Sequence, residues 1–260
     1  MSFTLRIILI CICFFQPLDS FDFSFKKITA WFSGTKEETF FQEFPIAYNA
    51  TVLLENSNGN INVKSWSLPK IAIEAIKSGP PKELSKISIE TIPLNNQLSI
   101  RTVLQSKNNY VHYKLIVPTQ LNLILKTENG SIKIKKSSGI IQATTSNGSI
   151  DIQEASNSIY ALASGPITVG FSSIPLQSTI SLKSLKSTVA LNLPNNTHAT
   201  VKAQTMFNTI ISHHFITLKP ITTTFNKQTW EHFKRQLQGT IGNGGAAISI
   251  AAYNGIQFLE

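Results

Sequence analysis

Residues 128–134 read Glu-Asn-Gly-Ser-Ile-Lys-Ile, and residues 146–152 read Ser-Asn-Gly-Ser-Ile-Asp-Ile. In both stretches an Asn-Gly pair, which readily adopts the positive φ angles of tight turns, precedes alternating apolar and polar residues. Alternation with a period of two is typical of a β-strand that has one buried face. Each stretch therefore predicts a turn followed by a short strand whose isoleucines face the core.

The Asn-Gly pair recurs along the chain, and its two central copies lie eighteen residues apart. This spacing suits one repeat of a solenoid, with two short strands and two turns, and stacked repeats bury a core that none could bury alone. We therefore expect Asn129 to lie beside Asn147, with a ladder of side-chain amides between them. The predicted structural turn residues are Asn58, Gly59, Asn129, Gly130, Asn147, Gly148, Asn254 and Gly255.

The rest of the chain also favours an all-β fold. Between residues 39 and 118, segments of strand length alternate with polar connections, and Gly79-Pro80-Pro81 is a strong break. We interpret this part as a region of paired strands that precedes the repeats. The predicted fold class is a parallel β-solenoid, with a β-sandwich as the alternative, in a single domain of residues 39–260.

The first twenty residues have the pattern of a signal peptide. Arg6 precedes an apolar run over residues 7–15, which is too short to cross a bilayer of about 30 Å. We expect an exported protein of the periplasm or cell surface, and an amino-terminal anchor in the inner membrane is the alternative. Residues 21–38 are interpreted as a linker or membrane-proximal tether. Both cysteines, Cys11 and Cys13, lie in the signal segment, so no disulfide is expected after it.

Composition limits the classes of partner. The chain has a formal net charge of +9 at pH 7, which favours attraction to anionic surfaces. The lysines are scattered, and no arginine-rich run is combined with stacking aromatic residues, so we expect no nucleic-acid binding. The predicted partner is an unidentified protein or glycan of the envelope, or an anionic surface.

One segment interrupts the strand pattern. Residues 219–238 are interpreted as an insertion, within which residues 226–238 predict a short helix. Asn226 could cap this helix, and Trp230, Phe233 and Leu237 recur at spacings of three and four residues. The insertion is expected to cover one side or end of the β stack.

Catalytic and metal-binding patterns are weak. Glycoside chemistry needs converging carboxylates, and the candidates are Glu128, Asp151 and Glu154. We interpret Asp151 and Glu154 as a solvated strand edge. A metal site would need His213 or His214 together with His232, but adjacent residues of a strand point to opposite faces. The sequence therefore predicts no catalytic residue, no metal site, no cofactor and no enzymatic activity.

The sequence resembles a bacterial family of exported β-repeat proteins of unknown function, known as "putative adhesins". The resemblance covers roughly residues 40–260 and is carried by the Asn-Gly-Ser-Ile units and by residues 54–66, 113–118, 237–246 and 253–255. It implies a right-handed, mostly parallel β-solenoid in the envelope, and it brings no catalytic motif. Residues 219–236 are longer and more polar than the usual connection of the family.

The leading functional hypothesis is a non-enzymatic, adhesin-like β-solenoid that offers a binding face at the envelope or cell surface. A periplasmic envelope-stress or regulatory module is the second hypothesis. A carbohydrate-active β-helix enzyme is the third, and it requires Glu128, Asp151 and Glu154 to converge in one groove.

Overall fold

The computed structural model of the protein describes residues 35–103, 108–206, 210–213, 218–220 and 235–259. The chain divides into two compact units, residues 1–33 and 34–260, and all described residues belong to the second unit. The expected signal peptide and most of the expected tether therefore lie outside the described residues.

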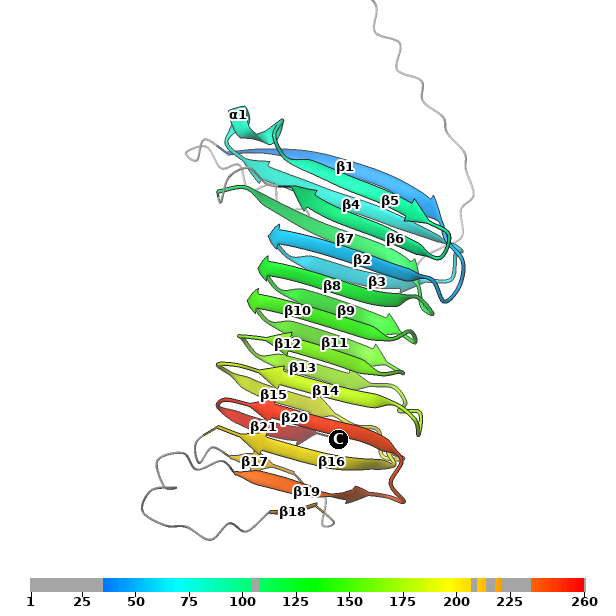
Figure 1. The fold of residues 1–260 in the computed structure, drawn as a ribbon, viewed down its shortest axis with the longest axis vertical. Coiled ribbons are helices and arrows are strands. Elements are labelled where there is room, and N and C mark those ends of the chain that lie inside the picture. Colours follow the sequence, from blue (N-terminus) through cyan, green and yellow to red (C-terminus); the bar gives the residue numbers. More distant parts are fainter. Residues whose placement is uncertain (1–34, 104–107, 207–209, 214–217, 221–234, 260) are drawn as a thin grey trace, which may run out of the picture. The chain divides into compact units, whose positions relative to one another are not determined.

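The described residues form an all-β fold with two large, mostly parallel sheets (Figure 1). Sheet A has ten strands in the order β1-β4-β7-β3-β9-β11-β13-β15-β21-β17, and sheet B has eleven in the order β18-β19-β16-β20-β14-β12-β10-β8-β2-β6-β5. The strands of sheet A are β1 (Lys36–Pro45), β4 (Lys70–Gly79), β7 (Tyr110–Pro118), β3 (Ile61–Trp66), β9 (Ile132–Ser137), β11 (Ile150–Ala155), β13 (Ile167–Phe171), β15 (Thr188–Asn192), β21 (Gly255–Leu259) and β17 (Ile211–Ser212). The strands of sheet B are β18 (Leu218–Pro220), β19 (Gln236–Ile241), β16 (Ala199–Thr205), β20 (Ala246–Ala252), β14 (Thr179–Ser184), β12 (Ile159–Ala163), β10 (Ile141–Asn147), β8 (Asn122–Asn129), β2 (Thr51–Asn58), β6 (Gln97–Val103) and β5 (Ser88–Leu94).

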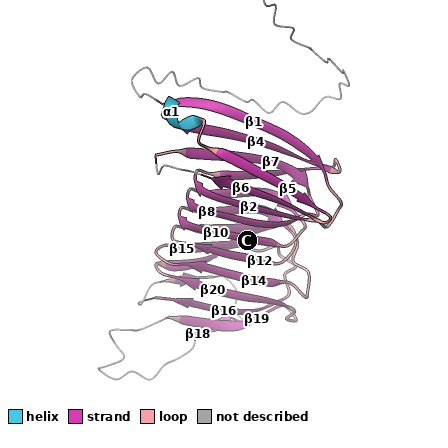
Figure 2. Ribbon diagram, turned by 45° about the horizontal axis from the view of Figure 1, so that its top comes forward, coloured by secondary structure: helices cyan, strands magenta, loops and turns pink. Residues whose placement is uncertain are grey.

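Helix is almost absent from the described ranges, as Figure 2 shows. The helix α1 (Pro81–Leu84) has four residues and begins directly after the predicted break at Pro80. Within these ranges no helix has the length and apolar character needed to cross a bilayer.

A two-strand unit builds the middle of both sheets. The pairs β8–β9, β10–β11 and β12–β13 each contribute their first strand to sheet B and their second strand to sheet A. Successive units pair in parallel register, so that Ile141 lies beside Leu123 and Ile159, and Ile150 lies beside Ile132. The Asn-Gly turns therefore join strands of different sheets and are not hairpin turns.

The core lies between the two sheets and is continuous through the units. The inward isoleucines Ile132, Ile134, Ile150 and Ile152 are all at most 2% exposed, and they belong to one apolar cluster with residues of sheet B. Burying a side chain of this size stabilises the fold by about 1.5–3 kcal/mol. Because each unit has neighbours above and below, most of this stabilisation depends on the stacking.

Antiparallel pairing is concentrated in the region before the repeats. β1 pairs with β4, β4 pairs with β7, and β5 pairs with β6, all in antiparallel register. The chain returns to parallel pairing where β7 lies beside β3 and β6 lies beside β2. The paired strands occupy residues 36–118 at one end of both sheets, so they begin three residues before the boundary predicted at residue 39.

Tyr113 links the two sheets in this region. It is 1% exposed on β7 of sheet A, and its hydroxyl lies 2.6 Å from the hydroxyl of Thr102 on β6 of sheet B. Burial raises the pKa of Tyr113 to about 12, and the hydrogen bond with Thr102 lowers it by a smaller amount. The folded protein therefore holds this phenol in its neutral form.

We expect the free energy of unfolding to decrease as the pH rises from about 10 to about 12. The reason is that Tyr113 loses its proton at a lower pH in the unfolded chain than in the folded protein. The contribution is complete below the unfolded pKa and is lost as the pH rises through the folded value. A shift from 10.0 to about 12 corresponds to about 3 kcal/mol. Urea unfolding at several pH values should show this loss in the wild type and a smaller loss in the double variant Tyr113→Phe/Thr102→Val. Equal alkaline losses in the two proteins would contradict the assignment.

The carboxyl-terminal strands are inserted into the stack out of chain order. β20 lies in parallel between β14 and β16, and β21 lies in parallel between β15 and β17. The last described strands therefore form an inner unit, while β16 and β17, which come earlier in the chain, lie outside it (Figure 1).

The predicted helix over residues 226–238 is wrong at its carboxyl-terminal end. Gln236–Ile241 form strand β19, which pairs in antiparallel register with β16 and places Leu237 opposite Ala203. Leu237 is 4% exposed between more exposed neighbours, so its pattern is that of a strand with one buried face. Residues 221–234, which hold the rest of the predicted helix, lie outside the described residues.

Candidate functional site

Three of the four Asn-Gly turns stack directly on one another. Asn58, Asn129 and Asn147 end strands β2, β8 and β10 in register. The Asn129 Nδ2 donates to Asn58 Oδ1 at 2.7 Å, and the Asn147 Nδ2 donates to Asn129 Oδ1 at 2.8 Å. Asn254 is not part of this ladder, because its Nδ2 donates to the carbonyl of Lys186 at 3.2 Å.

Backbone groups of the same turns are also bonded from one unit to the next. The Gly59 N–H donates to the carbonyl of Asn129 at 2.7 Å, and the Gly130 N–H donates to the carbonyl of Asn147 at 3.0 Å. The Thr127 hydroxyl donates to the carbonyl of Gly59 at 3.0 Å. These turns therefore use their polar groups to join neighbouring units, which is a structural role.

The three candidate carboxylates do not meet in one groove. Asp151 and Glu154 lie on β11 of sheet A, whereas Glu128 lies on β8 and points outward from sheet B. Asp151 accepts hydrogen bonds from Gln153 Nε2 at 3.3 and 3.4 Å, and Glu154 forms an ion pair with Lys135 at 3.5 Å. Glu128 therefore does not join Asp151 and Glu154 in one groove, as converging carboxylates would require.

Two of the three described histidines accept a backbone hydrogen bond, whereas the buried Nδ1 of the third, His213, has no hydrogen-bond partner within the described ranges. His112 and His198 each accept a hydrogen bond from a backbone N–H on Nδ1, at 3.1 and 2.9 Å. His213 follows β17, while His214 and His232 lie outside the described residues, so the metal site considered for them is not described here. Within the ranges that the structure covers, no group of three or more His, Cys, Asp or Glu side chains could hold a metal ion.

A mostly polar surface lies on the outside of sheet B. Strands β12, β14, β20, β16 and β19 are neighbours, and their paired residues form two rows that point away from the core. We call these two rows the outer strip. The first row is Tyr160, Ser181, Ser249, Lys202 and Gln238, and the second is Leu162, Lys183, Ala251, Gln204 and Gln236.

Alternation along each strand explains why these side chains reach the surface. On β16 the inward Val201, Ala203 and Thr205 are buried, while Lys202 and Gln204 between them are exposed. Because side chains of successive strand residues point to opposite faces, every second residue of this strand faces the solvent.

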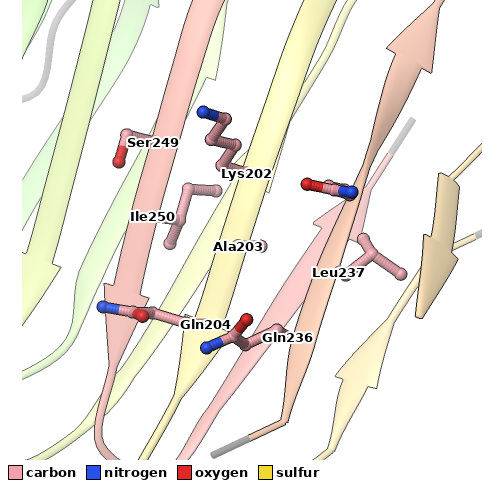
Figure 3. Close-up of a pocket in the computed structure, with 8 residues that line it drawn as sticks. Lys202, Ala203, Gln204, Gln236, Leu237, Ser249 and Ile250 are labelled. Atoms are coloured by element: carbon pink, nitrogen blue, oxygen red, sulfur yellow. The ribbon is translucent and has the colours of Figure 1, made fainter. Parts of the chain in front are cut away.

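The outer strip is hollowed in two places. A hollow of about 320 Å³ is lined by Lys202, Gln204, Gln236, Gln238 and Ser249. Figure 3 shows Lys202 and Ser249 close together at one end of this hollow and Gln204 and Gln236 at the other.

The second hollow has a volume of about 210 Å³ and is lined by Lys183, Leu185, Gln204 and Met206, among others. In the second row, the small side chain of Ala251 on β20 lies between the longer side chains of Lys183 on β14 and Gln204 on β16. These two longer side chains therefore rise on both sides of Ala251 and leave a shallow depression over it.

The charge around the outer strip has one sign. From Ala155 to Leu259 the sequence has one acidic residue, Glu231, against seven Lys and Arg residues. Glu231 lies outside the described residues, so the described part of this half has no carboxylate side chain. Lys183 and Lys202 are both exposed on the strip and give it a positive charge.

Sequence reasoning missed the outer strip as a site. Two signals pointed to it, namely the exposed alternate residues of the later strands and the scarcity of acidic residues after Glu154. The interpretation of Gln236 and Gln238 as helical separated them from Lys202 and Gln204, which the antiparallel pairing of β16 and β19 brings next to them.

Comparisons with known proteins give structural similarity without close sequence similarity. No family model matches the sequence, and no curated protein matches it. A solved structure of a "putative cell adhesion protein" from Clostridium sporogenes aligns with a TM-score of 0.46 and 13% identity, over 86% of this chain and 98% of that chain.

Two further solved structures are less similar. A "putative adhesin" from Bacteroides fragilis has a TM-score of 0.34 and 8% identity, over 85% of this chain and 97% of that one. A "putative lipid binding protein" from Parabacteroides distasonis has a TM-score of 0.21 and 10% identity, over 85% and 97% of the two chains. At such values the similarity does not transfer a function to this protein.

Proposed function

We propose that the protein is a non-enzymatic, adhesin-like binding protein of the cell envelope or cell surface, exported by its amino-terminal signal segment. The observation that carries this proposal is the outer strip of sheet B, a continuous exposed surface with two open hollows. Such a surface suits a partner that lies along the sheet, whereas sites for small molecules enclose most of the ligand.

The scaffold in this proposal is a right-handed β-solenoid. Its support is the register, in which successive strands of sheet B advance by 18 residues from Leu123 to Ile141 and by 18 from Ile141 to Ile159. A right-handed path is the usual one for parallel strands joined by a crossover. The sequence resemblance to exported adhesin-like proteins is consistent with this arrangement.

The arrangement of titratable residues supports the non-enzymatic part of the proposal. An active site generally brings together a nucleophile, an acid or base and a stabilising group in one cleft. Here Glu128 lies on the opposite outer face from Asp151, and Glu154 is paired with Lys135. The two hollows are lined by amide, hydroxyl, ammonium and apolar groups.

The test is affinity capture from envelope extracts with the mature protein at a low and a high salt concentration. We expect capture that weakens strongly at high salt, because exposed charges separated by more than about 10 Å are screened at about 0.1 M. Capture of a single protein with no dependence on salt would instead favour a periplasmic regulatory module. Absence of capture at both salt concentrations would overturn the proposed function.

A further inference from the structure

We propose that the outer strip of sheet B binds an extended acidic polysaccharide, with carboxylate or sulfate groups, that runs across the strands from β12 to β19. This inference rests on the proposed function and names its ligand class and its site. The occupant is a polymer because the strip is long and shallow, and it is acidic because the strip carries positive charge.

The length of the strip follows from the strand order. From Tyr160 on β12 to Gln238 on β19 there are four steps between neighbouring strands. At about 4.8 Å for each step, the row spans about 19 Å. This length accommodates several sugar residues in a line, and the depression over Ala251 lies in the second row beside it.

The side chains of the strip match the groups of such a polymer. Gln204, Gln236 and Gln238 each offer an amide donor and an amide acceptor, which suit the hydroxyl groups of a sugar. Lys202 lies directly between Ser249 and Gln238 in register and can pair with an acidic group. Tyr160, which is 42% exposed, provides an aromatic surface for the apolar face of a sugar ring at the other end of the row.

The charge density of the strip favours an acidic polysaccharide over a nucleic acid as the ligand. Double-stranded DNA carries one negative charge for about every 1.7 Å of its length, and proteins that bind it usually neutralise many phosphates. The strip presents two lysines, Lys183 and Lys202, over about 19 Å. That density suits a polymer in which acidic groups alternate with neutral hydroxyl groups.

A membrane surface fits less well. The middle strands of the strip present Ser181, Ser249 and Gln204 beside the two lysines, and the polar groups of these serine and glutamine side chains lose free energy when they leave water without new hydrogen bonds. A sugar polymer restores those bonds through its hydroxyl groups, whereas a lipid surface offers them only at its headgroups. Leu185 and Met206 lie beside the second row of the strip, at 46% and 44% exposure, where they can contact the sugar rings.

The experiment measures binding of the mature protein to polygalacturonate. The fully methyl-esterified polymer, which has the same backbone without the negative charge, is the control ligand. We expect the acidic polymer to bind and the ester to bind at least about tenfold more weakly, because the ester lacks the charge that pairs with the lysines. Vesicles of phosphatidylglycerol and phosphatidylcholine test the lipid alternative. Binding of the vesicles without binding of polygalacturonate, or equal binding of acid and ester, would overturn the inference.

Variants locate the site. Lys202→Glu should weaken binding of polygalacturonate about tenfold or more. Lys133→Glu is the matched control, because Lys133 has the same charge, is exposed and lies on the outer face of sheet A. Both variants should retain the wild-type melting temperature within a few degrees, since both positions are on the surface. An equal loss of binding in the two variants would place the ligand elsewhere and contradict the proposal.

The same samples distinguish the two proposals. If salt-sensitive capture from envelope extracts persists while polygalacturonate does not bind, the ligand class is wrong and the proposed function stands. If capture fails as well, both proposals fall.

Discussion

Substitution of Ile150 by Asp should unfold the repeat stack. Ile150 is 1% exposed, and it lies between Ile132 and Ile167 in the parallel register of sheet A. The change removes an apolar side chain from the core and buries a carboxylate for which this position has only apolar neighbours in register. We expect a loss of about 4 kcal/mol or more, which is a large part of the 5–15 kcal/mol that stabilises a typical domain.

The control is the adjacent residue. Asp151 points outward from the same strand, and its carboxylate contacts Gln153 at the surface. Asp151→Ala should therefore change the free energy of unfolding by no more than about 0.5 kcal/mol. Denaturant titration of both variants measures the difference, and equal midpoints would show that the assignment of inner and outer faces is wrong.

Replacement of Gly148 by Ala should have an effect of similar size through a different cause. A Cβ atom at this position would lie 1.9 Å from the carbonyl oxygen of Gly130 in the neighbouring unit. The contacted atom belongs to the backbone, which cannot move aside without breaking the hydrogen bonds between units. We expect a loss of about 3 kcal/mol or more, at the upper end of the effects of overpacking.

Gly170 is the control position for the substitution of Gly148. It lies on β13, and a Cβ atom there would have its nearest neighbours at 4.0 Å, which is ordinary van der Waals contact. Gly170→Ala should leave stability unchanged or raise it by about 0.4–1 kcal/mol, because alanine lowers the entropy of the unfolded chain. Thermal unfolding of the two variants separates close packing of the turns from a general effect of replacing glycine. A similar melting temperature for Gly148→Ala and Gly170→Ala would contradict the tight stacking of the turns.

The individual strands could be predicted largely from the sequence. Ile132, Ile134, Ile150 and Ile152 face the core as their alternation indicated, because the period of two is a local property of an extended chain. The pairing of Asn129 with Asn147 followed from the eighteen-residue spacing of two identical turns. In both cases the signal lay within a short stretch or between two similar stretches.

The prediction failed where the pattern was ambiguous. In residues 226–238 apolar residues at spacings of three and four suggested a helix, but Gln236, Leu237 and Gln238 belong to β19. The hydrogen bonds to β16 and the burial of Leu237 outweigh the weak helical signal of a few side chains.

The candidate site was less predictable than the fold. Its residues come from five strands between residues 159 and 252, and the chain order does not give their spatial order. Gln238 is next to Lys202, and Ser249 is next to Ser181, only because β19 and β20 return to β16 and β14. No local pattern connects these residues.

The sequence by itself determined most of the strands, the alternation of inward and outward side chains along them and the positions of the Asn-Gly turns, but not strand β19. The tertiary structure alone decided that β20 and β21 enter the stack before β16 and β17, and hence that the outer strip exists. The physical reason is that the alternation of inward and outward side chains follows from the residues of each strand alone. The backbone hydrogen bonds that join two strands are nearly the same for every residue type, so they do not specify which strands pair. The packing of the whole chain therefore determines which strand pairs with which.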